Sequence, residues 1–455
     1  MIQAVALDLI ASSEHRVVVG LGVTGLSCAR HLYRLGVSFS VVDTRSQPPG
    51  LEQLRQEMPE VAVYAGEYPD ELIASATELI VSPGIAIDEP VVAHAALAGV
   101  KVVGDIDLFV REAKAPIIGI TGSNAKSTVT ELVGDMARRA KLNVGVGGNL
   151  GTPALDLLDD ERQLYVLELS SFQLERAGKL GLAVAVVLNL SADHLDRHGN
   201  MPRYHQAKHR IFMGCSTAVA HSDDPLTVPL LEDSVPVVGW RLGEPALNGF
   251  GLRRDQGVEC LSHGFELLMP VTELAMEGRH NVANALAALA LGHAAGLPLD
   301  AMLDSLRHFA GLPHRCERVA VIEAVCFVND SKGTNIGATN AALTGIGGEH
   351  NIVLIAGGQG KGADFRELRG TVQKHCKHVV LIGEDAPKIE AALADVVEVT
   401  RVDTMEQAVA LAEKQASAGD IVLLSPACAS FDMFSGYVAR GESFVDSVGR
   451  LGGDQ

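Results

Sequence analysis

The chain has 455 residues, of which 47% are hydrophobic, 20% charged and 4% aromatic, a composition typical of a globular enzyme. A chain of this length is expected to form about three domains. Acidic residues outnumber basic ones by 56 to 37, and the net charge of −19 argues against nucleic acid and anionic membranes as partners.

The sequence carries no pattern of membrane insertion, secretion or disulfide bonding. No stretch reaches the roughly 18 uninterrupted apolar residues that a membrane span needs. The first part of the chain lacks a basic start and contains Asp8 and Glu14, so we expect no signal peptide. The seven cysteines are scattered without a CxxC pair, which argues against a disulfide framework and a zinc site. We therefore expect a cytoplasmic protein.

Short β-branched runs alternate with helical segments, which predicts βα units in three series. The first series has strands at 16–20, 39–43, 79–82 and 101–103, with a helix at 26–35. The second has strands at 117–120, 164–168 and 184–189, an added β-rich part at 221–270 and an alanine-rich helix at 280–293. The third has strands at 325–329, 351–356, 378–382 and 421–425. The series change near residues 105 and 312, which predicts three α/β domains.

A glycine-rich loop follows the first predicted strand and reads Gly20-Leu-Gly22-Val-Thr-Gly25. Asp43 ends the next strand, and together these features match the dinucleotide fingerprint of an NAD-dependent oxidoreductase. A turn that only packs helix on strand and a site for a nucleotide-diphosphate sugar fit the residues equally well. The loop therefore predicts a diphosphate group without deciding which one.

A second loop, from Thr121 to Thr128, lies between a predicted strand and a predicted helix. Its lysine and hydroxyl, Lys126 and Ser127, suit the phosphates of ATP and a Mg²⁺ ion. The loop departs from the strict P-loop pattern at Ile120 and Ala125. If the backbone at Ala125 is left-handed, its methyl group costs on the order of 1 kcal/mol.

The second loop, TGSNAKS, resembles that of the Mur ligase family, whose loop carries glycine at the position of Ala125. Further motifs of the family follow in order along nearly the whole chain. They are GNLGTP (148–153), LELSSFQL (167–174), NLSADHLDRHG (189–199), the segment around Lys208, GRHNVANALAA (278–288), GLPHR (311–315), NDSKGTN (329–335), GGQGKGADF (357–365) and SPACASFDMF (425–434).

The resemblance implies three domains, with boundaries after residues 105 and 311. They are an N-terminal Rossmann-like domain at 1–105 for the UDP-substrate, a central P-loop ATP-binding domain at 106–311 and a C-terminal Rossmann-like domain at 312–455 for the amino acid. The sequences at both ends are similar to the members that add D-glutamate to UDP-N-acetylmuramoyl-L-alanine. Such a ligase uses ATP, passes through an acyl phosphate and releases ADP and phosphate in cytoplasmic peptidoglycan precursor synthesis. We expect a monomer with these three substrates as its partners.

The resemblance also implies two Mg²⁺ ions and a set of catalytic side chains. Lys126 meets the phosphates, Ser127 and Glu168 bind one Mg²⁺, and His194 binds the other. Lys208 is expected to react with CO₂ and to reach the second Mg²⁺ as a carbamate. This reaction needs a neutral amine, hence a lysine of depressed pKa.

Three sets of binding residues follow from the same resemblance. The ATP set is Gly122, Ser123, Asn124, Ala125, Lys126, Ser127, Thr128, Asn281, Asn284, Arg315 and Asp330. The UDP-substrate set is Gly22, Val23, Thr24, Asp43, Thr44, Arg45, Ser82, Asn149 and His194. The D-glutamate set is Lys332, Thr334, Lys361, Ser430, Phe431 and Tyr437.

Three other hypotheses compete with this one. An NAD-linked oxidoreductase explains the first loop but gives no role to the second loop, to Glu168 or to the third domain. A binding or regulatory protein that lost turnover is favoured only by Ala125. A ligase of the same family with another acceptor or amino acid, such as a folylpolyglutamate synthase-like enzyme, shares most of the motifs.

Thermal unfolding separates the ligase from the oxidoreductase. A ligand that binds the folded chain raises its melting temperature. ATP with Mg²⁺ is therefore expected to raise the melting temperature, whereas NAD⁺ and NADH leave it unchanged. Stabilisation by a nicotinamide cofactor without any effect of ATP contradicts the ligase hypothesis.

Overall fold

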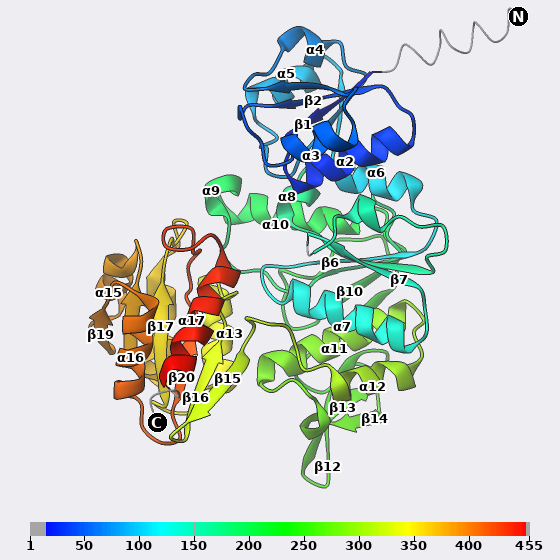
Figure 1. The fold of residues 1–455 in the computed structure, drawn as a ribbon. Helices are drawn as coiled ribbons and strands as arrows, with labels where there is room; N and C mark the ends of the chain where they lie inside the picture. Colours follow the sequence, from blue (N-terminus) through cyan, green and yellow to red (C-terminus); the bar gives the residue numbers. More distant parts are fainter. Residues whose placement is uncertain (1–14, 150, 452–455) are drawn as a thin grey trace, which may run out of the picture.

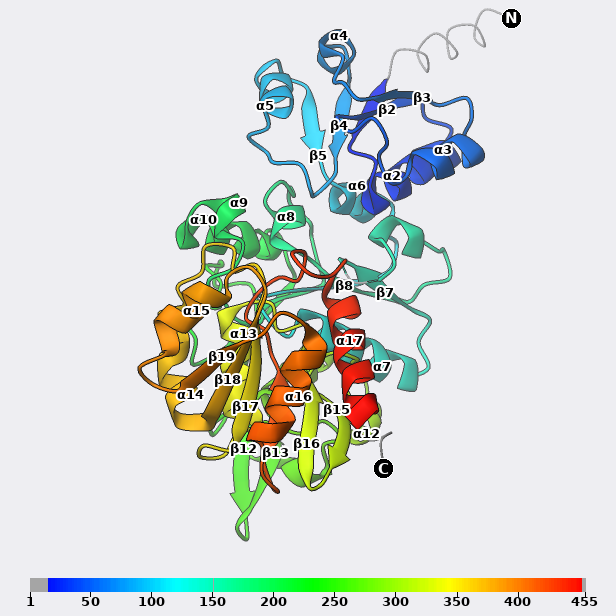
Figure 2. The same cartoon turned by 60° about the vertical axis from the view of Figure 1, so that its left-hand side comes forward.

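The computed structural model describes residues 15–149 and 151–451. These residues form three α/β domains, each built on its own sheet (Figure 1). The N-terminal domain lies at one end of the central domain, and the C-terminal domain packs along the side of the central domain (Figure 2). The fold class expected from the sequence is confirmed. The expectation of no signal peptide concerns residues that lie mostly outside the described ranges.

The N-terminal domain has a parallel sheet of five strands in the order β3-β2-β1-β4-β5. The strands are β1 (Arg16–Val19), β2 (Phe39–Asp43), β3 (Ala62–Ala65), β4 (Glu78–Val81) and β5 (Lys101–Val103). The helices are α2 (Val23–Arg34), α3 (Leu51–Glu57), α4 (Asp70–Ala74), α5 (Pro90–Leu97) and α6 (Asp105–Glu112). Every residue of β2 and β4 is buried, as expected of strands covered on both faces.

The central domain has nine strands in the order β14-β13-β12-β11-β10-β9-β6-β8-β7. They are β6 (Ile117–Thr121), β7 (Val144–Gly148), β8 (Leu164–Glu168), β9 (Val184–Val187), β10 (Thr217–His221), β11 (Val237–Trp240), β12 (Phe250–Asp255), β13 (Val258–His263) and β14 (Glu266–Pro270). The β-rich part expected at 221–270 therefore extends the main sheet. Its last three strands pair antiparallel with one another.

The helices of the central domain cover this sheet. They are α7 (Lys126–Arg139), α8 (Ser171–Leu174), α9 (Leu195–His198), α10 (Met201–His209), α11 (Arg279–Ala294) and α12 (Leu299–His308). Short 3₁₀ turns lie at η1 (Ala154–Leu157), η2 (Arg210–Phe212) and η3 (Val271–Glu273). Helices α11 and α12 both pack against α7, the helix that begins at the second loop.

The C-terminal domain has six strands in the order β15-β16-β20-β17-β18-β19, and only the β15–β16 pair is antiparallel. The strands are β15 (Glu317–Ile322), β16 (Val325–Asn329), β17 (Ile352–Gly357), β18 (Cys376–Ile382), β19 (Glu398–Arg401) and β20 (Ile421–Leu424). The helices are α13 (Ile336–Ile346), α14 (Arg369–His375), α15 (Ala386–Leu393), α16 (Met405–Gln415), α17 (Tyr437–Leu451) and the 3₁₀ turn η4 (Phe365–Leu368).

A buried arginine ties the loops of the C-terminal domain together. Arg440, on α17, is 1% exposed. Its guanidinium donates to the carbonyl oxygens of Ser331, Gly357 and Cys428 and to the Ser331 hydroxyl. These three residues follow, or lie at the end of, β16, β17 and β20, so one side chain fixes the loops at one edge of the sheet.

None of the helices within the described ranges is both long enough and apolar enough to cross a bilayer.

A buried carboxyl group lies where the N-terminal domain meets the central domain. Asp105 begins α6, is 4% exposed and accepts a hydrogen bond of 2.8 Å from Gln173 of α8. Its second oxygen, Oδ1, is buried and has no hydrogen-bond partner among the described residues. Burial raises the pKa of Asp105 to about 6.

This raised pKa predicts how the stability depends on pH. The folded chain holds a proton on Asp105 that the unfolded chain releases, so this group lowers the free energy of unfolding as pH rises from about 4 to 6. Asp105→Asn removes this decrease in the free energy of unfolding. The stability of the variant relative to the native chain should therefore rise by about 2 kcal/mol between pH 4 and 7. Urea denaturation at both pH values measures this difference.

Asp304 provides a control of opposite sign. Its hydrogen bond from Arg139 lowers the pKa of Asp304, so the charged form stabilises the fold once pH exceeds that pKa. Asp304→Asn should therefore lose stability relative to the native chain as pH rises toward about 5, and this difference should stay nearly constant above it. A constant difference between Asp105→Asn and the native chain from pH 4 to 7 contradicts the prediction.

Candidate active site

The second loop connects β6 to α7 and turns into the helix at Ala125. The backbone of Ala125 is left-handed, with φ 66° and ψ −6°, and the residue caps the helix without a side-chain hydrogen bond. The first helical hydrogen bond runs from the Val129 amide to the Ala125 carbonyl at 3.0 Å. The free amide groups at this helix start form the type of site that binds a phosphate group.

Two lysines of the sequence-predicted set meet at one carbonyl oxygen of this loop. Lys126 Nζ donates to the oxygens of Gly122 at 2.9 Å and Ser123 at 3.0 Å. Lys208 Nζ, on α10, donates to the same Gly122 oxygen at 2.8 Å and to Thr121 Oγ1 at 3.3 Å. Two lysine amino groups thus lie against one acceptor.

This arrangement changes the protonation of both lysines. Lys208 is 1% exposed, and burial together with the positive charge of Lys126 lowers its pKa well below the usual value. Burial also lowers the pKa of Lys126, against the opposing charges of Glu168 and Asp193. The lowered pKa of Lys208 favours its neutral amine, the form that can react with CO₂.

Glu168 ends β8, the strand beside β6, and is 3% exposed. Its Oε1 accepts a hydrogen bond of 2.6 Å from Asn149. Its Oε2 is buried and no described residue pairs with it. Burial alone would raise the pKa of Glu168, but the charge of Lys126 and the bond from Asn149 hold it below the usual value. The result is an ionised carboxylate with one free oxygen.

Ser127 lies at the first turn of α7 and receives a contact from the C-terminal domain. The guanidinium of Arg315 donates to Ser127 Oγ at 2.7 Å. Burial lowers the pKa of Arg315, and the carboxylates of Glu168 and Asp330 oppose that effect. The segment that joins the second and third domains therefore delivers a cation to the phosphate loop.

His194 begins the short helix α9 and has a left-handed backbone with φ 53°. Burial lowers its pKa to about 4, and nearby lysines add to this effect despite the neighbouring Asp193. The imidazole is neutral above that pH and can act as a metal ligand. Phe172 of α8 packs edge-on against the ring at 4.9 Å between centroids.

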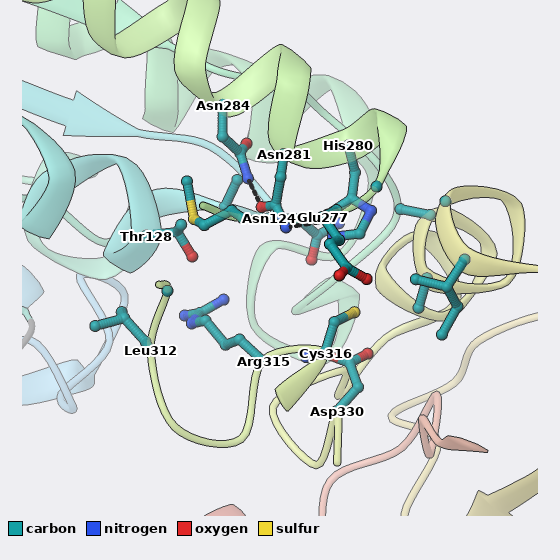
Figure 3. Close-up of a pocket in the computed structure, with 18 of the residues that line it drawn as sticks. Asn124, Thr128, Glu277, His280, Asn281, Asn284, Leu312, Arg315, Cys316 and Asp330 are labelled. Carbon is teal, nitrogen blue, oxygen red and sulfur yellow. Dashed lines mark hydrogen bonds between the residues drawn. The ribbon is translucent and has the colours of Figure 1, made fainter. Parts of the chain in front are cut away.

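A cavity of about 970 Å³ lies between the central and C-terminal domains. Figure 3 shows His280, Asn281 and Asn284 on α11 facing Arg315, Cys316 and Asp330 across this space. The sequence-predicted nucleotide residues on its wall are Asn124, Ala125, Thr128, Asn281, Asn284, Arg315 and Asp330. The volume lies at the upper end of the range for small-ligand sites, roughly 300 to 1,000 Å³.

The wall of this cavity combines the predicted residues Asn281 and Asn284 with His221 and Trp240, which the sequence analysis did not single out. Asn284 Nδ2 donates to Asn281 Oδ1 at 3.0 Å, and Asn281 Nδ2 donates to the Glu277 carbonyl at 2.7 Å. His221 and Trp240 stack face to face on the wall, with centroids 4.1 Å apart. They end β10 and β11, so strand position could have suggested them.

A smaller space of about 20 Å³ lies between the same two domains and is lined by His194, Thr334 and Lys361. Lys361 Nζ donates to Asp193 Oδ1 at 2.9 Å, and Asn335 Nδ2 donates to Asp193 Oδ2 at 3.1 Å. Asp193, absent from the predicted set, therefore connects the domains here.

The other residues predicted to bind D-glutamate differ in their contacts and in how far their side chains are exposed. Lys332 Nζ lies over the Tyr437 ring, 3.8 Å from its centroid, and burial with nearby cations lowers the pKa of Lys332 to about 8. Ser430 is buried, whereas Phe431 is 71% exposed and its side chain points to solvent.

The UDP-substrate set lies mostly on the N-terminal domain. Gly22, Val23 and Thr24 form the start of α2, and Ser82 Oγ donates to the Gly20 carbonyl at 2.9 Å. Asp43 is 3% exposed; it accepts bonds from the Leu21 amide at 2.7 Å and from the Arg45 guanidinium. Asp43 therefore fixes the glycine loop, while the half-exposed Arg45 beside Thr44 faces outward.

Metal ligands at this site would be shared between the protein and the nucleotide phosphates. No group of three or more His, Cys, Asp or Glu side chains within the described residues could hold a metal ion. Mg²⁺ commonly uses one or two carboxylates together with substrate phosphates. The free oxygen of Glu168 beside the phosphate loop fits such an ion.

Three family models match the chain in the order of its domains. They are "Mur ligase MurD-like, N-terminal domain" over residues 14–104, "Mur ligase middle domain" over 120–292 and "Mur ligase, glutamate ligase domain" over 314–428. The chain belongs to the Mur ligase family. The resemblance found in the sequence is confirmed, and the oxidoreductase hypothesis is wrong.

Curated relatives extend over the full length of this Mur ligase. It is 54% identical to the UDP-N-acetylmuramoylalanine–D-glutamate ligase of Pseudomonas fluorescens, over 98% of this chain and 100% of that protein. It is 53% identical to the protein of the same name in Pseudomonas aeruginosa, with the same coverage.

Solved structures share the fold at low sequence identity. A pseudomurein peptide ligase type C from Methanothermus fervidus has a TM-score of 0.61 at 17% identity, covering 96% of this chain and 100% of that one. UDP-N-acetylmuramate-alanine ligase from Thermotoga maritima has a TM-score of 0.57 at 18% identity, with 97% and 100% covered. These likenesses confirm the three-domain architecture.

Proposed function

We propose that this Mur ligase joins D-glutamate to UDP-N-acetylmuramoyl-L-alanine in the cytoplasm, with ATP converted to ADP and phosphate. The 54% identity to D-glutamate ligases over nearly the whole chain carries this assignment. The site supports it because cations and a free carboxylate oxygen converge on the phosphate loop beside a nucleotide-sized cavity.

The chemistry requires activation of a carboxylate, which is a poor acyl donor. The terminal phosphoryl group of ATP passes to the carboxylate of the acceptor, which gives an acyl phosphate and ADP. The amine of D-glutamate then attacks the acyl carbon, and phosphate leaves. In such a transfer the protein mainly positions groups and neutralises charge. Lys126 and Arg315 supply that charge from two domains.

Mg²⁺ would neutralise the phosphate oxygens of ATP during this transfer. Ser127 and the free oxygen of Glu168 would hold one ion, since a hydroxyl and an ionised carboxylate are suitable hard ligands. The neutral His194 and a carbamate on Lys208 would hold the second. Gly122 to Thr128 would bind the phosphates through main-chain amides.

Carbamylation of Lys208 is favoured by its surroundings. The neutral amine adds to CO₂, forms a nitrogen–carbon bond and releases one proton, which turns a neutral group into an anion. Burial and the charge of Lys126 favour the neutral form of the amine that this reaction requires. An anion at this position would also attract the positive charge of Lys126.

Substrate placement follows from the three domains. The N-terminal residues Gly22 to Thr24, Arg45 and Ser82 would hold the nucleotide sugar, with its acceptor end toward Asn149 and His194. The base of ATP would lie against Asn281 and Asn284, with its ribose toward Asp330. D-glutamate would place its two carboxylates on donors from Lys332, Thr334, Lys361, Ser430 and the Phe431 backbone, near Tyr437. Its binding would compete with Asp193 for Lys361. We propose a monomer.

Substrate choice is tested by phosphate release. With ATP, Mg²⁺ and UDP-N-acetylmuramoyl-L-alanine, release is expected with D-glutamate and not with L-glutamate, L-alanine, L-lysine or meso-diaminopimelate. The reason is that the chain is 54% identical to a D-glutamate ligase over nearly its whole length. Equal release with several amino acids, or none with D-glutamate, contradicts the assignment.

The carbamate is tested at Lys208. Lys208→Ala should lose at least about 100-fold in kcat, as loss of a metal-supporting group does, and the native enzyme should lose activity in CO₂-free buffer and regain it with bicarbonate. Lys114→Ala, which removes an exposed lysine paired with Asp160, provides the control. Activity of the native enzyme that does not respond to CO₂ removal contradicts the carbamate.

A further inference from the structure

The phosphate loop contains a backbone conformation that its sequence disfavours. Ala125 adopts φ 66°, the left-handed region in which a methyl group clashes with the backbone and which glycine adopts freely. Such a conformation persists only where its surroundings hold it. The neighbours of Ala125 therefore have to supply that constraint.

Asn189 follows β9 and forms hydrogen bonds with the main chain of the two residues before Ala125, Ser123 and Asn124. Its carbonyl accepts a bond of 2.9 Å from the Ser123 amide. Its side-chain Oδ1 accepts from the Asn124 amide at 2.8 Å, and its Nδ2 donates to the Asn124 carbonyl at 3.1 Å. The side chain thus saturates the N–H and the C=O of one loop residue.

These bonds restrict the peptide group between Asn124 and Ala125. The Asn124 carbonyl is directed at Asn189 Nδ2, so rotation of this peptide would break a bond inside a half-buried site. The chain after it must enter α7 within one residue, and the left-handed backbone at Ala125 makes that turn. The bond therefore opposes escape of Ala125 to an unstrained conformation.

We infer that Asn189 is a positioning residue that holds the strained phosphate loop in its nucleotide-ready form, acting through Asn124. This inference rests on ATP being the ligand of the loop. Two further residues outside the loop contact Asn124: Asn335 Nδ2 donates to Asn124 Oδ1 at 3.0 Å, and Asn124 Nδ2 donates to Ser191 Oγ at 3.4 Å. Both contacts hold the side chain of Asn124 and leave its peptide groups to Asn189.

The inference predicts a coupling between two substitutions. Without Asn189 the loop of an alanine-containing chain relaxes, and ATP binding has to restore the strained turn. Asn189→Ala should weaken the binding of ATP with Mg²⁺ about tenfold, the effect of losing two ordinary hydrogen bonds. Adding Ala125→Gly should recover about fivefold, because glycine adopts the turn without strain.

In the native background the loop is already held, so Ala125→Gly should tighten binding at most about twofold. Calorimetric titration of ATP with Mg²⁺ into the four proteins, without the other substrates, measures the coupling. Asn143→Ala, which removes an asparagine at the opposite end of α7, is the matched control and should bind as the native chain does.

The outcomes are distinct. Equal gains from Ala125→Gly in both backgrounds, or no weakening by Asn189→Ala, overturn the role of Asn189. Absence of ATP binding by the native chain overturns the proposed function itself. If thermal melting reports that Asn189→Ala does not fold, Asn189→Asp keeps the acceptor for the Asn124 amide, loses the donor and should give the same coupling.

Discussion

The convergence of two lysine side chains on the Gly122 carbonyl is the constraint on which the active site depends. Lys126 comes from the loop itself and is half-buried, whereas Lys208 comes from α10 and is fully buried. A molecule with a net charge of −19 has to concentrate positive charge locally to hold a triphosphate. The loop carbonyls hold the Lys126 amino group in place, and phosphate oxygens can then replace these carbonyls as its hydrogen-bond partners.

The site is completed by two contacts from the C-terminal domain. Arg315 reaches Ser127 on the nucleotide side, and Lys361 reaches Asp193 on the amino-acid side. Because each contact joins two domains, opening the cleft between them separates the charged groups from the phosphate loop. The large cavity remains open on the nucleotide side in this arrangement, whereas the space lined by His194 and Lys361 is only about 20 Å³.

The sequence predicted most of the strands that are buried on both faces, because their apolar runs are continuous. It missed β3, β7, β15 and β19, whose residues are partly exposed, and also the more buried strand β10. The first helix was expected to begin after Gly25, three residues later than α2 does. Gly25 lies within α2, at a position where a side chain would lie 1.9 Å from the Gly20 carbonyl oxygen.

The site was predictable where its residues lie within motifs. Lys126, Glu168 and Lys208 were proposed in this way, and the family match confirms the resemblance that named them. The sequence analysis considered a left-handed backbone at Ala125, and the structure has one. Asn189 and Asp193 lie inside the motif at 189–199 but were not assigned, because their partners are far away in the chain and only folding brings them near.

The guanidinium of Arg440 has a consequence for how the enzyme attracts its amino acid. Its hydrogen bonds go to neutral carbonyls and one hydroxyl, so hydrogen bonding leaves a full positive charge beneath the loops at the edge of the C-terminal sheet. Low polarisability around a buried charge lets its field extend further than in water. The field of Arg440 would favour a dicarboxylate at these loops, against the opposing charges of Asp330 and Asp432 and of the surface as a whole.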